Sequence, residues 1–188
     1  MSALPLVWAP ADPVAAGLNL VTAVGVSFAA GYWAHRLPSE RLARDGPLLR
    51  LRTFERDGRI YADRLAIGRW KGHLPEAGAF FAGGTSKRRL VGADPVSLRA
   101  FAIETRRAER SHWVSLLLVS TVPLLWNGVL GSVLMILYGL VSNAPCIAVQ
   151  RYNRARLVRV LDRHSGAAGT QRAQELRSRT STPLSDDG

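Results

Sequence analysis

Two long apolar blocks, separated by a basic segment, dominate the pattern of this chain. Residues 14–34 and residues 113–149 contain no charged side chain, whereas residues 35–112 hold 17 Arg and Lys. A helix that crosses a membrane needs about 20 apolar residues, so the first block fits one crossing. The second block would be about 55 Å long as one helix, which is too long for a single crossing.

An Asn-Gly step inside the second block predicts that this block folds back as a helical hairpin. The sequence Trp126-Asn127-Gly128 is a turn signal, and the two arms would be residues 113–126 and 128–149. The first arm is short and contains Pro123, so it extends backward through Ala108, tilts, or stops part-way across. The pattern therefore predicts an all-α integral membrane protein with about three transmembrane helices.

The distribution of basic side chains predicts how these helices are oriented. Residues 1–34 and 113–150 hold no Arg or Lys, while residues 151–188 hold 8. The positive-inside rule then predicts a multi-pass protein of the cell membrane, with its N-terminus outside and its loop 35–112 and C-terminus cytoplasmic. The first block lacks the basic flank of a signal peptide and has a longer apolar core, which favours a retained anchor over a cleaved leader.

The basic loop mixes apolar and charged side chains between residues 48 and 70. Two interpretations remain open for this stretch. Asp57-Gly58 could turn a hairpin, or Ile60, Tyr61 and the residues after them could form a short interfacial helix. We favour the helix at the membrane surface, because Arg, Trp and Tyr are the residues that anchor at headgroup depth.

The end of the loop and the end of the chain show contrasting patterns. Asp94-Pro95 is typical of a helix start, and the apolar positions after it recur at helical spacing, which predicts a helix that continues into the second span. Residues 165–188 are small, polar and charged, which predicts a disordered tail. Residues 1–164 would then form a single membrane domain.

The net charge of the chain limits the classes of binding partner that are expected. The formal net charge is +11, carried by 23 Arg and only 2 Lys, which suggests either nucleic acid or an anionic membrane surface. The Arg side chains gather near the ends of the apolar blocks, and no aromatic-basic recognition motif stands apart from them. We therefore expect membrane lipids as partners and no nucleic acid.

The sequence contains no metal-ligand cluster, no phosphate-binding loop and no nucleophile-elbow motif. We accordingly predict no metal and no cofactor. The single cysteine, Cys146, lies in the third predicted span, where it is expected to be a small buried apolar side chain.

A cluster of ionisable residues precedes the second apolar block and is the first candidate for chemistry. On a helix, Glu109 and Glu104 lie three and eight residues from His112, within a broad arc of one face. A carboxylate beside an imidazole can hold its tautomer, so that His112 acts as a general base. The alternative interpretation is that His112 only anchors the chain among lipid headgroups. However, the orientation of the helices in the membrane would require only the Arg residues, and it does not explain Glu104, Glu109 and His112 beside them.

A second polar cluster begins within the last part of the third predicted span and continues after it. Asn143 in a membrane helix needs a hydrogen-bond partner, and Gln150, Tyr152 and Asn153 offer neutral donors and acceptors that suit sugar hydroxyls. For Asn143 alone, polar contact between helices is the alternative interpretation. The two clusters flank one apolar block, so we expect them to meet at the same membrane face.

Several stretches of this chain resemble the glycosyl-4,4'-diaponeurosporenoate acyltransferases, small bacterial membrane proteins of staphyloxanthin-type carotenoid synthesis. These stretches are Phe54-Glu55 with Gly58, Arg69-Trp70-Lys71 with Leu74-Pro75, Ser86-Lys87-Arg88 with Leu90, Glu104-Thr105-Arg106-Arg107-Ala108-Glu109 with His112-Trp113, Asn143 with Pro145, and Gln150-Arg151-Tyr152-Asn153-Arg154 with Arg156-Leu157. The resemblance implies transfer of a fatty acyl chain onto a sugar hydroxyl of a glycosylated C30 carotenoid at the cytoplasmic membrane face.

The residues and the resemblance together lead to a membrane-bound acyltransferase that esterifies a glycosylated carotenoid or a related glycolipid. Acyl-CoA or a similar thioester would be the donor, and carotenoid-pathway enzymes are candidate partners. The predicted catalytic residues are His112, Glu109 and Glu104. The predicted donor or phosphate contacts are Arg106, Arg107, Arg110, Lys71, Lys87 and Arg88. The predicted acceptor contacts are Asn143, Gln150, Arg151, Tyr152, Asn153 and Trp70. The alternative is a non-catalytic membrane scaffold or anionic-lipid-binding protein.

Overall fold

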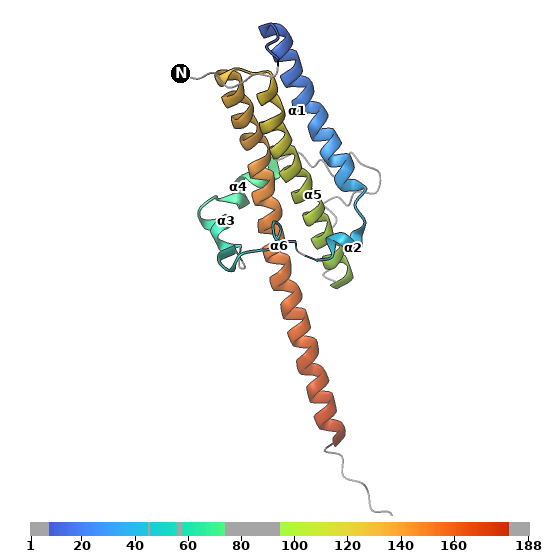
Figure 1. Ribbon diagram of the computed structural model, residues 1–188. Helices are drawn as coiled ribbons and strands as arrows, with labels where there is room; N and C mark the ends of the chain where they lie inside the picture. Colours follow the sequence, from blue (N-terminus) through green and yellow to red (C-terminus); the bar gives the residue numbers. More distant parts are fainter. Residues whose placement is uncertain (1–7, 45, 56–57, 74–94, 181–188) are drawn as a thin grey trace, which may run out of the picture.

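Three long helices form the frame of the molecule. The computed structural model describes residues 8–44, 46–55, 58–73 and 95–180 (Figure 1). The long helices are α1 (Asp12–His35), α5 (Pro95–Thr121) and α6 (Val129–Thr180), and every other element in the described ranges is a short helix. The predicted all-α class is confirmed.

Two of the long helices are long and apolar enough to cross a membrane. They are α1 and the Val129–Arg163 part of α6. The second predicted crossing falls on α5, which carries charged side chains between residues 104 and 110, so its apolar part is short. The described residues therefore contain two candidate spans, and the crossing by α5 stays a prediction.

The second apolar block forms the predicted hairpin. Helix α5 begins at Pro95 and runs through the charged cluster to Thr121, and a short 3-10 helix η5 (Val122–Leu125) with Pro123 follows it. The chain then turns at residues 126–128, and α6 starts at Val129. Both the helix through the charged cluster and the turn at the Asn-Gly step are confirmed.

The three long helices lie in a row, with α1 beside α5 and α5 beside α6 (Figure 1). Amide groups join α1 to the hairpin turn. The Asn19 Oδ1 atom accepts hydrogen bonds from Trp126 Nε1 at 2.9 Å and from Asn127 Nδ2 at 2.7 Å. Such bonds satisfy polar groups among apolar helices, and they fix the end of the row opposite to the charged cluster.

The basic loop folds into short helices that pack around the hairpin. They are α2 (Ser39–Leu42), η1 (Thr53–Glu55), α3 (Arg59–Asp63), α4 (Ile67–Trp70) and η2 (Lys71–His73). Helix α2 packs against α5, and η1 and α3 pack against α6 (Figure 1). The stretch 58–70 is helical, in keeping with the preferred interpretation, but it forms two short helices. Buried Tyr61 and Ile67 pack against Val149 of α6, which attaches α3 and α4 to the hairpin.

The tail differs from the sequence-based expectation. Helix α6 continues without a break to Thr180 and has 52 residues, so residues 165–180 are helical (Figure 1). This stretch holds three Ala, three Arg and two Gln, which are good helix formers. Extending an existing helix also avoids the cost of nucleation, so a polar tail without a packed face can still be helical. Residues 181–188 lie outside the described ranges.

Candidate active site

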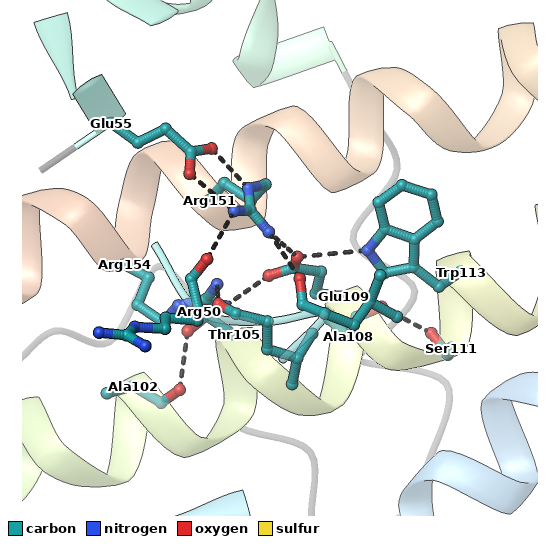
Figure 2. Close-up of polar contacts among 12 residues, drawn as sticks. Arg50, Glu55, Ala102, Thr105, Ala108, Glu109, Ser111, Trp113, Arg151 and Arg154 are labelled. Atoms are coloured by element: carbon teal, nitrogen blue, oxygen red, sulfur yellow. Dashed lines mark hydrogen bonds and ion pairs between the residues drawn. The ribbon is translucent and has the colours of Figure 1, made fainter. Parts of the chain in front are cut away.

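A buried ion cluster joins the charged ends of the two hairpin helices (Figure 2). Glu109 of α5 is fully buried. Its Oε1 atom lies 2.6 Å from Arg151 Nη1, and its Oε2 atom lies 2.5 Å from Arg154 Nη1. Arg151 and Arg154 are three residues apart on α6, so both guanidiniums face the same carboxylate. Trp113 Nε1 also donates to Glu109 Oε1, at 3.3 Å.

Glu55, from the basic loop, completes this cluster. Its two oxygens accept from Arg151 Nε and Nη2, each at 2.7 Å, which is a bidentate pair. Tyr61 Oη and the Arg52 backbone N–H also donate to this carboxylate. We call Glu55, Glu109, Arg151 and Arg154 the buried ion cluster. Its two negative and two positive charges balance, which lowers the cost of burying them.

Backbone carbonyls of the loop bind the same guanidiniums. Arg151 donates to Leu48 O at 3.2 Å and to Arg50 O at 3.1 Å, and Arg154 donates to Leu49 O. These bonds fold residues 48–50 onto α6. The buried ion cluster therefore holds the basic loop against the hairpin, beside the residues predicted to carry the chemistry.

The pH dependence of stability should report the Glu55 contacts. Burial raises the pKa of Glu55, but the bonds from Arg151, Tyr61 and Arg52 outweigh burial and lower this pKa from 4.5 to about 2. A lowered pKa in the folded state stabilises the fold above pH 4.5, and this contribution is lost as the pH falls toward 2. We expect the free energy of unfolding of wild type to exceed that of Glu55→Gln by about 3 kcal/mol near neutral pH.

Thermal unfolding of both proteins between pH 7 and pH 2 measures this difference. It should shrink below pH 4.5 and nearly vanish at pH 2. A difference that stays constant over this range would show that the Glu55 carboxylate does not form these contacts.

His112 pairs with Asn143 across the hairpin. The His112 Nδ1 atom lies 3.1 Å from Asn143 Oδ1. The Asn143 amide nitrogen donates to Gly139 O at 3.0 Å and to Ser142 Oγ at 3.1 Å, which turns the amide oxygen toward the imidazole. An amide oxygen can only accept a hydrogen bond, so Nδ1 carries the hydrogen and the neutral ring has its basic lone pair on Nε2. Asn143 thus fixes the tautomer that a general base needs.

The two predicted acidic partners of His112 are engaged elsewhere. Both oxygens of Glu109 bind guanidiniums, and Glu104 Oε1 lies 3.2 Å from Arg107 Nε. Glu109 or Glu104 was predicted to orient His112. In the structure, the group that contacts the imidazole Nδ1 is the Asn143 amide. For the buried Glu109 the physical reason is that two guanidinium charges attract a carboxylate more strongly than a neutral imidazole does.

The predicted donor contacts are dispersed. Arg107 Nη1 donates to the carbonyls of Ala34, His35 and Leu37 at 2.7–2.8 Å and so caps the end of α1. Arg110 Nη2 lies 3.4 Å from Arg41 O. Arg106 is half-buried on α5, and Lys87 and Arg88 lie outside the described residues.

The predicted acceptor contacts follow one another along α6. Gln150 is buried and Asn153 is half-buried, while Arg151 belongs to the buried ion cluster. The Tyr152 ring lies beside Lys71 of the loop. Trp70 Nε1 donates to Leu65 O at 2.7 Å, a bond within the loop.

Sequence reasoning missed three members of this region: Glu55, Tyr61 and Arg154. Arg154 was detectable, because its spacing of three from Arg151 places both on one helix face. Glu55 offered no spacing signal, since it lies 96 positions from Arg151 in the sequence. Within the described residues, no group of three or more His, Cys, Asp or Glu could hold a metal ion.

Two apolar helices of membrane-crossing length, with a polar site at their charged ends, place this chain among α-helical proteins with candidate membrane spans. The chain belongs to the glycosyl-4,4'-diaponeurosporenoate acyltransferase family, because the family model of that description matches residues 46–163. Family membership indicates an acyltransferase. The match covers η1, α5, the part of α6 up to residue 163 and all members of the buried ion cluster.

Individual relatives agree with this assignment. A glycosyl-4,4'-diaponeurosporenoate acyltransferase of Staphylococcus aureus strain N315 is 29% identical over 130 residues, which cover 67% of this chain and 75% of the relative. Proteins of the same name from strains bovine RF122 / ET3-1 and USA300 are 28% identical over 128 residues, with the same coverage. No solved structure matches the chain.

Proposed function

We propose that this protein is a membrane-bound acyltransferase that esterifies a sugar hydroxyl of a glycosylated carotenoid or a related glycolipid. The observation that carries the proposal is the His112–Asn143 pair, in a chain that belongs to an acyltransferase family. An amide that orients an imidazole serves the same purpose as the third group of a catalytic triad. The pair sits where the charged half of α5 gives way to its apolar half.

The chemistry requires one base and no covalent enzyme intermediate. The Nε2 atom of His112 accepts the proton of the sugar hydroxyl while the hydroxyl oxygen forms a bond to the thioester carbonyl carbon. The tetrahedral intermediate then collapses, the carbon–sulfur bond breaks, and the imidazolium returns its proton to the departing thiolate. The products are the sugar ester and a free thiol, so atoms and charge balance.

The remaining site residues would bind the two substrates. Among the arginines of α5 we assign the donor contacts to Arg106 and Arg110, whose guanidiniums suit phosphate or a developing oxyanion. Gln150 and Asn153 would bind sugar hydroxyls. Lys87 and Arg88 remain proposed donor contacts.

The membrane supplies the third element of the proposal. Large apolar side chains are exposed along both candidate spans, for example Leu20 and Phe28 on α1 and Leu130 and Val141 on α6. Contiguous exposed apolar surface of this kind suits contact with lipid. We propose three crossings with the N-terminus outside, so that the Arg-rich loop, the buried ion cluster and His112 lie at the cytoplasmic face.

Mass spectrometry of lipid and pigment extracts tests the function. The full chain is expressed in a host that makes a glycosylated C30 carotenoid, and the extract is compared with that of an empty-vector strain. A glycoside whose mass has increased by one fatty acyl group supports the proposal. An acylated product in the glycolipid fraction alone would shift the acceptor to a glycolipid. An extract with no new acyl ester, despite stable protein in the membrane, would overturn the function.

Substitution of Asn143 should affect activity through the tautomer of His112. We expect Asn143→Leu to lower the initial rate of acyl transfer about tenfold or more, because Nδ1 loses its acceptor. Asn143→Asp keeps an oxygen acceptor and should retain most of the rate. Single-turnover assays on membranes with matched protein levels measure both. Equal losses in the two variants would argue against a role in orienting the imidazole.

A further inference from the structure

Two cations, one from the loop and one from α6, lie against one aromatic ring of α6. The Lys71 ammonium is 5.1 Å from the centroid of the Tyr152 ring, and the Arg156 guanidinium is 5.5 Å from it. Arg156 Nη1 also donates to Tyr152 Oη at 3.3 Å. We call Lys71, Tyr152 and Arg156 the Tyr152 cation pair.

The fold holds this arrangement in place. Lys71 follows α4, whose Ile67 is fully buried, and Trp70 and Tyr152 pack in the same apolar cluster. Gly58 adopts a left-handed conformation with φ +67° at the start of α3, and a side chain there would come 3.5 Å from the Tyr152 ring. Packing from α3 and α4 therefore brings a loop lysine to the ring that the α6 arginine already contacts.

The electrostatics of the pair favour an anion. Two like charges beside one ring repel each other, and the face of a tyrosine offsets this only in part. The carboxylate of the neighbouring Glu55 is bound by Arg151, Tyr61 and the Arg52 N–H, so its charge is balanced inside the buried ion cluster. A phosphate presents several oxygens that can accept from Lys71 and from Arg156, because ionised partners form the strongest hydrogen bonds.

We propose that the Tyr152 cation pair binds a phosphate ester, and that this phosphate belongs to the acyl donor. The inference rests on the proposed function and extends it: it makes the donor a phosphate-bearing thioester such as an acyl-CoA, and it moves Tyr152 from the acceptor side to the donor side. An anionic lipid headgroup carries the same chemistry, and the experiment separates the two sources.

Binding of coenzyme A to the full-length protein in nanodiscs of phosphatidylcholine tests the proposal. We expect Lys71→Gln and Arg156→Gln each to weaken binding about tenfold, since each removes one charge-assisted contact. Arg64→Gln is the matched control, because it removes an exposed positive charge of the same loop that does not contact the ring. The same variants should raise the KM for acyl-CoA while leaving kcat nearly unchanged.

A second arm uses nanodiscs that contain phosphatidylglycerol, with the same proteins. If the variants weaken coenzyme A binding, and phosphatidylglycerol does not compete with it, the donor is the source of the phosphate. If they change only the affinity for phosphatidylglycerol, the donor assignment is overturned in favour of a headgroup. If neither ligand distinguishes them from Arg64→Gln, the phosphate site is wrong. A His112→Gln variant that stays fully active while coenzyme A binding remains intact would contradict the proposed base alone.

Discussion

Replacing His112 by Gln should lower the initial rate of acyl transfer by at least about 100-fold, because a positioned general base contributes 10²–10⁴-fold to such reactions. Gln keeps a polar side chain that can still bond to Asn143, so the hairpin contact is preserved. It has no lone pair of suitable basicity to accept the proton of a sugar hydroxyl. The measurement is the initial rate of ester formation in membranes with equal amounts of protein.

A control variant and a stability measurement show whether the loss of rate is specific to the His112 imidazole. His73→Gln is the matched control, because His73 is an exposed histidine of the basic loop, and we expect it to keep the wild-type rate. The thermal midpoint of His112→Gln should stay close to that of wild type. Undiminished ester formation at equal protein levels would remove His112 from the mechanism. It would also favour the alternative of a membrane scaffold, in which His112 is replaceable.

Replacing Glu109 by Gln should unfold the charged end of the hairpin rather than slow the chemistry directly. The substitution leaves the guanidiniums of Arg151 and Arg154 with one carboxylate between them, at a site where Arg154 and Glu109 are fully buried. Removing one partner of a buried ion pair costs about 3–5 kcal/mol. For a chain of this length, that corresponds to a midpoint lower by roughly 10 °C.

The matched control for this prediction is Glu104→Gln, which removes a carboxylate that is partly exposed and pairs with Arg107. Such a pair contributes at most about 1 kcal/mol, so its midpoint should barely change. The double variant Glu109→Gln with Arg154→Met should recover much of the loss, because Glu55 and Arg151 then balance each other. Similar midpoints for Glu109→Gln and Glu104→Gln would contradict a structural role for the buried ion cluster.

This difference between the two acids affects how activity data are interpreted. Loss of activity in a Glu109 variant would not identify a catalytic carboxylate, since the loop that carries Glu55 would detach with it. His112 and Asn143 are the positions at which activity and stability can be separated.

The sequence located most of the frame because the relevant signals are local. The lack of charge in residues 14–34, the proline at position 95 and the Asn-Gly step at 127–128 predict α1, the start of α5 and the turn. The helical tail up to Thr180 escaped prediction, since a polar composition suits both a solvated helix and a disordered segment.

The chain by itself determined that apolar helices flank an arginine-rich loop, and which polar residues stand at their charged ends. Only the tertiary structure decided how these residues are paired. Glu109 was expected to orient His112 and instead neutralises two arginines of α6, while the Asn143 amide takes the place on the imidazole. The reason is physical: a helix face lets a carboxylate reach several neighbours, and the buried positive charges from another helix compete for it most strongly. The sequence of α5 alone does not show which charges of α6 will bind Glu109.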